Sequence, residues 1–229
     1  LKRDKIQLAD ALSDISHQFK TPLTSISVMM DLLSEEHLDP IRRREFISQL
    51  RTQLERLTWL TEALLKLSKL DAEAVTFKYQ RVQVCRLIQK ACGPLLIPME
   101  LKGQTLSVEA DDGFLFCDLN WTAEALSNIL KNCMEHTPIH GKIHVSSSSN
   151  VLFTEIRVQD SGPGIDKADL PFIFQRFYRG KNADRDSVGI GLAMARAILE
   201  AQGGSIEAGN IPDGGAGFIL RFPAIKDQK

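Results

Sequence analysis

Three side chains near the N-terminus place a nucleophile beside groups that can orient it. They are His17, Gln18 and Thr21, and Pro22 follows directly. A neutral imidazole is a competent nucleophile near neutral pH, and on a helix Thr21 lies one turn above His17 on the same face. Pro22 offers no N–H to the carbonyl of Gln18, which predicts a backbone bent beside the histidine. The set suits a histidine that accepts a chemical group from another molecule.

Two asparagines, Asn128 and Asn132, stand one helical turn apart in the segment "SNILKNCMEHTP". Two amides on one helix face can hold a magnesium ion that bridges triphosphate oxygens, with water completing its coordination. The spacing by itself is weak evidence, because polar helix faces produce it by chance.

A third segment, "IRVQDSGPGI", joins a carboxylate to two glycines. Alternation along a strand puts Ile156, Val158 and Asp160 on one buried face, and a buried carboxylate requires a donor. Gly162 and Gly164 leave the backbone uncovered, so a flat ligand can approach closely. An adenine that donates its amino group to Asp160 satisfies both observations. A polar turn with a half-buried aspartate satisfies them equally, and the segment alone does not separate the two.

Phosphate chemistry is indicated further on, where Gly189 and Gly191 precede a predicted helix. Backbone N–H groups at a helix N-terminus favour a phosphate when glycine leaves them uncovered. Upstream, Arg176 and Arg179 follow an aromatic cluster and are long enough to reach phosphates when a covering segment closes. No predicted strand leads directly into the glycine pair, which argues against a Rossmann-type dinucleotide site.

The elements that must position these residues fall into two halves. In residues 1–72 apolar side chains recur at alternating steps of four and three, a seven-residue repeat that predicts two bundle-forming helices. The first series is Leu8, Leu12, Ile15, Phe19, Pro22, Ile26, Met29 and Leu33, and the second is Ile47, Leu50, Leu54, Leu57, Leu60, Leu64, Leu67 and Leu70. His17 lies away from this stripe and is predicted to face water. Pro40 suits the first position of the second helix.

Two helices cannot enclose so many leucines, so this helical hairpin is predicted to form a four-helix bundle in a homodimer. After a linker over residues 73–82, residues 83–229 alternate helix and strand patterns and predict an α+β sandwich, one sheet backed by helices. The predicted helices are 82–92, 118–136 and 189–203, the first of these starting inside the linker, and the predicted strands are 105–110, 114–117, 142–149, 152–160, 205–210 and 217–223.

Composition limits the possible functions. The 229 residues carry a net charge of -1 and are 43% hydrophobic, which supports real cores and gives no basic surplus for nucleic acid. The four cysteines have no zinc-type spacing and are interpreted as reduced core residues. No apolar run reaches the roughly 18 residues of a membrane span.

The segment "SHQFKTPLTSI" resembles the phosphoacceptor box of bacterial sensor histidine kinases, and the later segments resemble that family's nucleotide boxes in the family's order. The resemblance implies that His17 accepts phosphate from ATP, that Gln18 orients the ring and that Thr21 places water for dephosphorylation of a partner. It implies a Bergerat (GHKL)-type sandwich with Mg²⁺ on Asn132 and Asn128. The nucleotide-binding residues that it implies are Asn128, Asn132, His136, Asp160, Gly162, Gly164, Arg176, Arg179, Gly189 and Gly191.

The chain departs from the family's pattern at four positions. Gln18 stands where the family usually has an acid, Glu135 where it often has a basic residue, His136 where it often has tyrosine, and Ser187 where many members have glycine. Gln18 can accept a hydrogen bond from the ring N–H but carries no negative charge, which predicts a slower kinase. Ser187 predicts a stiffer hinge in the segment that covers ATP.

Three functions remain open. The first is a kinase core that passes phosphate from His17 to an aspartate of a response regulator receiver domain. The second is a dimeric nucleotide-binding scaffold without phosphotransfer. The third is a hydrolysing ATPase of the related superfamily, which Asn128 disfavours because those enzymes have a water-activating glutamate there. By the resemblance the chain is the cytoplasmic portion of a cell-membrane sensor, attached only through upstream segments, with no nucleic acid as a partner.

Overall fold

A computed structural model describes residues 2–35, 38–180, 188–212 and 214–224; in the first helix, side chains are described at residue 13 and from residue 15 onward. The chain divides into two compact units, Leu1–Ser68 and Lys69–Lys229. Each unit is described by itself.

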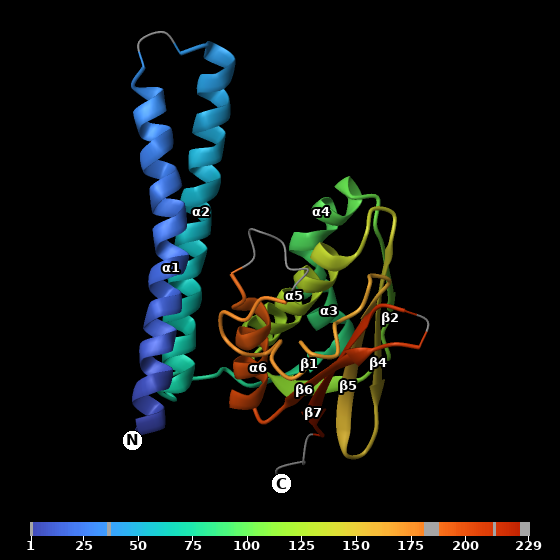
Figure 1. The fold of residues 1–229 in the computed structure, drawn as a ribbon. Helices are drawn as coiled ribbons and strands as arrows, with labels where there is room; N and C mark the ends of the chain where they lie inside the picture. Colours follow the sequence, from blue (N-terminus) through green and yellow to red (C-terminus); the bar gives the residue numbers. More distant parts are fainter. Residues whose placement is uncertain (1, 36–37, 181–187, 213, 225–229) are drawn as a thin grey trace. The chain divides into compact units, whose positions relative to one another are not determined.

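The first unit is a helical hairpin (Figure 1). Helix α1 covers Lys2–Leu33 and helix α2 begins at Pro40 and ends at Asp71. The prediction for Pro40 is confirmed, because a missing N–H costs nothing at the first helical position. Helix α1 continues across Pro22 without a break.

The apolar stripe of α1 is largely turned inward, as predicted. Pro22 and Met29 are buried, and Ile15, Phe19 and Ile26 are half-buried. The side chains of Leu8 and Leu12 lie outside the described ones. On α2 the stripe is buried at Leu60, Leu67 and Leu70 but half-exposed at Ile47 and Leu54. One hairpin therefore leaves part of its own stripe uncovered.

The second unit contains four α-helices, one turn of 3-10 helix and seven strands. In chain order they are β1 Gln80–Gln83, α3 Val84–Cys92, the 3-10 turn Gly93–Leu95, α4 Leu96–Leu101, β2 Thr105–Glu109, β3 Phe114–Cys117, α5 Leu119–His136, β4 Lys142–Ser149, β5 Phe153–Asp160, α6 Gly191–Ala201, β6 Ser205–Asn210 and β7 Ala216–Pro223.

Five strands form one sheet in the order β2-β4-β5-β7-β6, with only the β2–β4 pair parallel. The helices α3, α5 and α6 lie on one face of it (Figure 1). The core between these layers consists of fully buried aliphatic and aromatic side chains, among them Leu126, Ile129, Ile143, Ile156, Ile198 and Phe218. The predicted α+β sandwich is confirmed.

One detail of the prediction is wrong. Strand 114–117 does not join the main sheet but pairs with β1 in a separate two-stranded ribbon. Strand β1 lies in the stretch that was expected to be linker and the start of a helix, so Val82 and Gln83 are extended rather than helical. Val82 sits opposite Leu115 and both are buried, and it is this cross-strand packing that selects the extended form.

Helix α5 is fixed at both ends. At its start Asp118 accepts hydrogen bonds from the N–H groups of Asn120 and Trp121, which confirms one of the two predicted caps. At its end the buried Gln104 donates its amide to the carbonyls of Met134 and Thr137, at 3.0 and 2.7 Å. The helix that carries the asparagines is therefore held rigidly against the rest of the unit.

The cysteines are unpaired: Cys92, Cys117 and Cys133 are buried and Cys85 is half-buried. Burial raises the pKa of Cys92 and of Cys117 to about 11, which keeps these thiols protonated and unreactive. Within the described residues, no helix is both long enough and apolar enough to serve as a membrane span.

Candidate functional site

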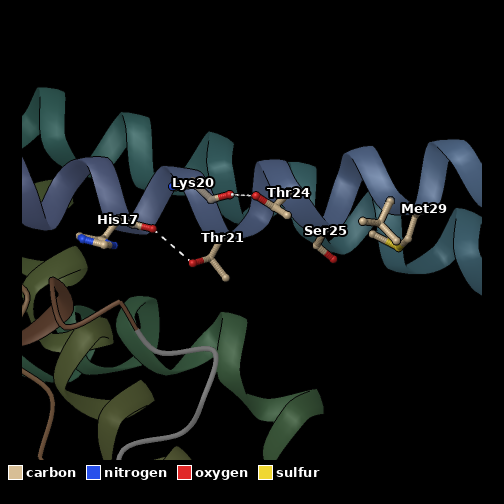
Figure 2. Close-up of a pocket in the computed structure, with 7 residues that line it drawn as sticks. His17, Lys20, Thr21, Thr24, Ser25 and Met29 are labelled. Carbon is tan, nitrogen blue, oxygen red and sulfur yellow. Dashed lines mark hydrogen bonds between the residues drawn. The ribbon is translucent and has the colours of Figure 1, made fainter.

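The histidine of the first unit is exposed on the outer side of α1, as its position off the apolar stripe predicted. It borders an open groove whose lining includes Thr21, Thr24 and Ser25, and Figure 2 shows these side chains projecting from one side of the helix. The Thr21 hydroxyl donates to the carbonyl oxygen of His17 at 3.3 Å. An accessible imidazole thus lies beside a row of hydroxyls from successive turns of the same helix.

Gln18, the residue expected to orient the ring, is half-buried. Buried Pro22 directly follows Thr21 and cannot donate to the carbonyl of Gln18. The predicted set is therefore carried by two consecutive turns of α1.

In the second unit, helix α5 carries a row of polar side chains one turn apart: Asn128, Asn132 and His136, all half-buried. Asn128 faces the start of α6, because a Cβ on Gly191 would lie 3.7 Å from its Oδ1 atom. At the other end of the row, a Cβ on Gly162 would lie 2.8 Å from the carbonyl oxygen of His136. The structure thus places the two glycine segments at the two ends of one row on α5.

The carboxylate at the end of β5 is buried, with Asp160 5% exposed. Its Oδ1 atom accepts hydrogen bonds from the N–H groups of Gly162 at 2.8 Å and of Ala216 at 3.1 Å. These donors supply what a buried carboxylate requires and hold its orientation. The face predicted for Ile156, Val158 and Asp160 is confirmed, because all three are buried.

Cys133, on the buried side of α5, also borders this carboxylate. Burial raises the pKa of its thiol well above the ordinary value, and the charge of Asp160 and a hydrogen bond to it raise the pKa further. The thiol is therefore a neutral donor toward Asp160.

The segment after Asp160 is tied to the β6–β7 hairpin. Gly164 has a φ of 79°, which favours glycine, and a Cβ there would lie 2.7 Å from Oδ1 of Asn210. Asn210 accepts from the N–H of Ile165 and donates to its carbonyl, both at 2.7 Å. The glycine segment is thus held by side-chain as well as backbone contacts.

The second glycine pair begins α6. Gly189 has a φ of 75°, and its carbonyl accepts from the N–H of Phe177 at 2.8 Å. A Cβ at Gly189 would collide with the backbone of Tyr178, so the position requires glycine both for its φ and for its space. Within the described residues, Ile190 makes no side-chain cap to the first turn of α6, whose N–H groups are suited to an anion.

The two arginines differ in their surroundings. Arg176 forms an ion pair with Asp71, a residue of the same unit, at 2.5 Å. Arg179 is exposed. Between them, Tyr178 donates its hydroxyl to Asp169 at 2.7 Å, a bond that raises the pKa of the tyrosine. The expectation for Ser187 falls in residues 181–187, outside the described residues.

Glu135 does not face a phosphate in place of a basic residue; it lies one turn from Lys131 with the ion-pairing atoms 3.8 Å apart. Sequence reasoning missed three residues of this site: Asn210, Gly215 and Ala216, which reach Asp160 and its loop from another strand pair. The "DGG" of this stretch signalled a hairpin turn, but a contact with a residue more than fifty positions away leaves no local pattern.

Comparison with known proteins supports this geometry. Residues 7–73 match the His Kinase A (phospho-acceptor) domain, and residues 117–226 match the histidine kinase-, DNA gyrase B- and HSP90-like ATPase family. Similar curated proteins include the sensor protein SphS of Synechococcus elongatus, 30% identical over 93% of this chain and 54% of that protein. The signal transduction histidine-protein kinase BaeS of Escherichia coli is 27% identical over 99% of this chain and 49% of that protein.

Solved structures share the fold. The Acinetobacter baumannii histidine kinase AdeS superposes with a TM-score of 0.77, at 21% identity over 90% of this chain and 97% of that one. The histidine kinase ThkA, solved in complex with the response regulator protein TrrA, gives a TM-score of 0.81, at 21% identity over 99% of this chain and 65% of that one.

The chain spans about half the length of the curated relatives it matches. Its two units carry the two domains of these relatives in the same order, with the exposed histidine in the first and the Asp160 site in the second. The chain belongs to the bacterial two-component sensor histidine kinases, as their phosphoacceptor and ATP-binding core.

Proposed function

We propose that this chain is an ATP-dependent protein-histidine kinase core in which His17 accepts the γ-phosphoryl group of ATP. The observation that carries the proposal is the exposure of His17 on α1 in the same chain as a nucleotide-type site. An imidazole in that position is open to a phosphoryl donor, and Asp160, with the glycine segments on either side of α5, provides for the donor.

The geometry of the second unit gives the nucleotide a direction. The base lies at Asp160, whose carboxylate is held in place and accepts the adenine amino group. The triphosphate lies at the other end of α5, where Asn128 faces Gly191 and the first turn of α6. Electrostatic stabilisation of the phosphates thus comes from helix N–H groups, and Arg179 adds a positive charge to the same segment.

A magnesium ion fits this arrangement. Asn128 and Asn132 present amide oxygens on one helix face, and oxygen donors shared with water and phosphates are what Mg²⁺ takes in nucleotide sites. Within the described residues there is no cluster of three carboxylate, histidine or cysteine side chains that would form a separate metal cage. When bound, Mg²⁺ would neutralise charge on the phosphates; Asn128 and Asn132 would hold it.

The transfer itself requires little of the protein beyond position and charge. A ring nitrogen of His17 forms the new bond to the γ-phosphorus, and the bond from that phosphorus to the β–γ bridging oxygen breaks, releasing ADP. Gln18 can accept a hydrogen bond from the other ring nitrogen but cannot take its proton, so that proton passes to solvent or to the phosphate. Thr21 has no part in this step.

Hydrolysis is disfavoured by the same site. Asn128 occupies the position on α5 that faces the phosphate end, and an amide cannot act as a general base toward water. The γ-phosphate therefore persists until His17 reaches it. A scaffold that binds nucleotide without transfer remains the second candidate, on account of Gln18.

Incubation with γ-labelled ATP and Mg²⁺ tests the proposal. We expect an acid-labile, base-stable label on the chain, and its loss in the variant His17→Gln. The matched control is His140→Asn, because His140 is also exposed and its φ of 63° suits asparagine. A label that survives in H17Q contradicts the proposal. Bound nucleotide without label indicates the scaffold, and free phosphate without label indicates an ATPase.

We also propose that the first unit forms a homodimer. Three apolar side chains of α2 are half-exposed or more: Ile47 at 50%, Leu54 at 55% and Leu65 at 58%. At 100° per residue they lie within about 20° of one another on one face of the helix. The buried Leu60 and Leu67 lie at least about 120° from Leu54. A second copy of the hairpin covers this exposed stripe.

Sedimentation of the chain tests the dimer. Leu54→Glu places a charge in the stripe and is expected to give monomers at concentrations where the unaltered chain is dimeric. Ser48→Glu adds the same charge at an exposed position about 120° away on α2 and is expected to leave the dimer intact. Equal dissociation of both variants, or of neither, contradicts the assignment of this face.

The acceptor of the phosphoryl group is proposed to be an aspartate on the receiver domain of a response regulator. The structurally similar ThkA was solved in complex with a response regulator protein, and the groove beside His17 leaves the imidazole open to such a partner. The reverse reaction, dephosphorylation of that aspartate, is assigned to water placed by Thr21. Transfer of label from the chain to a purified receiver domain, and none to its Asp→Asn variant, checks the first half.

The chain is further proposed to act at the cytoplasmic face of a cell membrane. Support comes from the curated relatives, which are named sensor proteins and are about twice as long as this chain. Fractionation of the protein from its own cells tests the location. Recovery in the soluble fraction alone contradicts it.

A further inference from the structure

The loop that follows the adenine-binding Asp160 is held at its far end by one side chain, that of Asn210. The Oδ1 atom accepts the N–H of Ile165 and the Nδ2 atom donates to the carbonyl of Ile165, each at 2.7 Å. Asn210 thus pairs with the backbone of Ile165 much as a neighbouring strand does, through one donor and one acceptor. The absence of a side chain at Gly164 lets the amide come this close.

The start of the same loop is held by the residue opposite Asn210. Asn210 of β6 pairs with Ala216 of β7, and the N–H of Ala216 donates to Oδ1 of Asp160 at 3.1 Å. One cross-strand pair therefore grips both ends of the loop from Asp160 to Ile165. Gly162, inside the loop, donates to the same Oδ1 at 2.8 Å, so a shift of the loop moves a donor of the carboxylate.

We propose that Asn210 is a positioning residue for the nucleotide base: it holds the loop in the conformation that presents Asp160 to adenine before the nucleotide arrives. The inference rests on the proposed function, since it assumes that Asp160 accepts the adenine amino group. Asn210 acts through Ile165 and makes no contact with the reacting phosphate. Because the pairing is exposed to solvent, water replaces it when it is lost, and the unit keeps its fold while the loop loses its fixed position.

Three expectations follow for Asn210→Ala in the full chain. The amide of Ile165 exchanges hydrogen faster in the nucleotide-free protein, because its acceptor is gone. The Kd for ADP rises about threefold to tenfold, the range of one net hydrogen bond. The rate of autophosphorylation at saturating ATP stays unchanged, because the chemistry lies at the other end of α5.

The lost contact is on the base side, which gives the test its specificity. The factor in Kd is expected to be the same for ATP, ADP and adenosine, and the same with and without Mg²⁺. Asn210→Asp keeps the acceptor for the Ile165 N–H but turns an anionic oxygen toward the Ile165 carbonyl, and it is expected to lose at least as much affinity.

The matched control is Asn150→Ala. Asn150 also fixes a turn with its side chain, accepting from the N–H groups of Leu152 and Phe153, but it does so at the β4–β5 turn and not at the Asp160 loop. It is expected to leave the Kd for ADP unchanged, with a melting temperature close to that of N210A. If N210A does not fold, Asn210→Ser, which retains one hydrogen bond, is measured in its place with the same expectations at reduced size.

An unchanged Kd for ADP in N210A overturns the inference, and so does an equal loss in N150A or a loss that grows with the number of phosphates. Absence of ADP binding by the unaltered chain overturns both this inference and the nucleotide part of the proposed function. The two failures are therefore distinguishable.

Discussion

Gly215 packs against the backbone of Asp160 so closely that a Cβ at residue 215 would overlap the Asp160 carbonyl oxygen. Gly215 also has a φ of 101°, so both its conformation and its surroundings exclude other residues. The β6–β7 hairpin can donate to the Asp160 carboxylate only because this residue has no side chain.

Gly215→Ala is expected to abolish measurable nucleotide binding, because the hairpin must move away from Asp160 and the N–H of Ala216 moves with it. Titration with ADP checks this. Gly214→Ala is the control: Gly214 has a similar φ of 90°, but a Cβ there meets nothing within 4 Å. It bears the backbone strain of about 1 kcal/mol without the collision, and binding should persist. If both variants bind alike, the close approach is not what matters.

Gln18→Glu is expected to speed autophosphorylation. A carboxylate beside His17 orients the ring as the amide does and can also take its proton, which general-base catalysis supplies at about 100-fold or less in such half-buried positions. The initial rate at saturating ATP is the measurement. Gln53→Glu, the same change on α2, controls for added charge in the first unit. An unchanged or lower rate in Q18E contradicts the role given to residue 18.

Thr21→Ala is expected to spare autophosphorylation and to weaken dephosphorylation of the partner's aspartyl phosphate about tenfold or more, the range of a lost water-positioning contact. Thr24→Ala is its control, because Thr24 lines the same groove and donates in the same way, to the carbonyl of Lys20 at 2.9 Å. Both rates are followed with labelled phosphate. Equal loss of both activities in T21A removes the separation of roles.

Glu155 predicts a specific pH dependence of stability. Its side chain is buried, which by itself raises the pKa, but hydrogen bonds from Arg157 and Arg221 outweigh this and hold the pKa below the ordinary 4.5. A carboxyl with a lowered pKa in the folded state stabilises the fold above its unfolded pKa, and this stability is lost as the pH falls through the folded pKa.

Glu155→Gln is therefore expected to lower the free energy of unfolding at pH 7 by about 1–3 kcal/mol, because two arginines lose their charged partner. The difference from the unaltered chain should shrink below about pH 4, where Glu155 itself becomes protonated. Urea unfolding of the two proteins at both pH values is the measurement. A difference that stays constant with pH would show that the charge of Glu155 is not what stabilises the sheet.

Much of the fold was predictable because it is written in local patterns. The heptad steps predicted α1 and α2, Pro40 their boundary, and Asp118 the start of α5. Strand β1 was missed, because four residues with one buried side chain carry too little pattern, and Val82 becomes extended only by packing against Leu115. Local propensity loses there to a cross-strand contact.

The candidate site divides in the same way. Residue types and spacing alone determined the exposed His17, the asparagine row on α5, the buried Asp160 and the two glycine pairs, because each lies within one element or one turn. Only the tertiary structure decided that Gly191 faces Asn128, that Gly162 lies by the carbonyl of His136, and that Asn210, Gly215 and Ala216 grip the loop of Asp160. These contacts join segments more than forty residues apart, and the order of strands in the sheet brings them together where no spacing in the sequence records it.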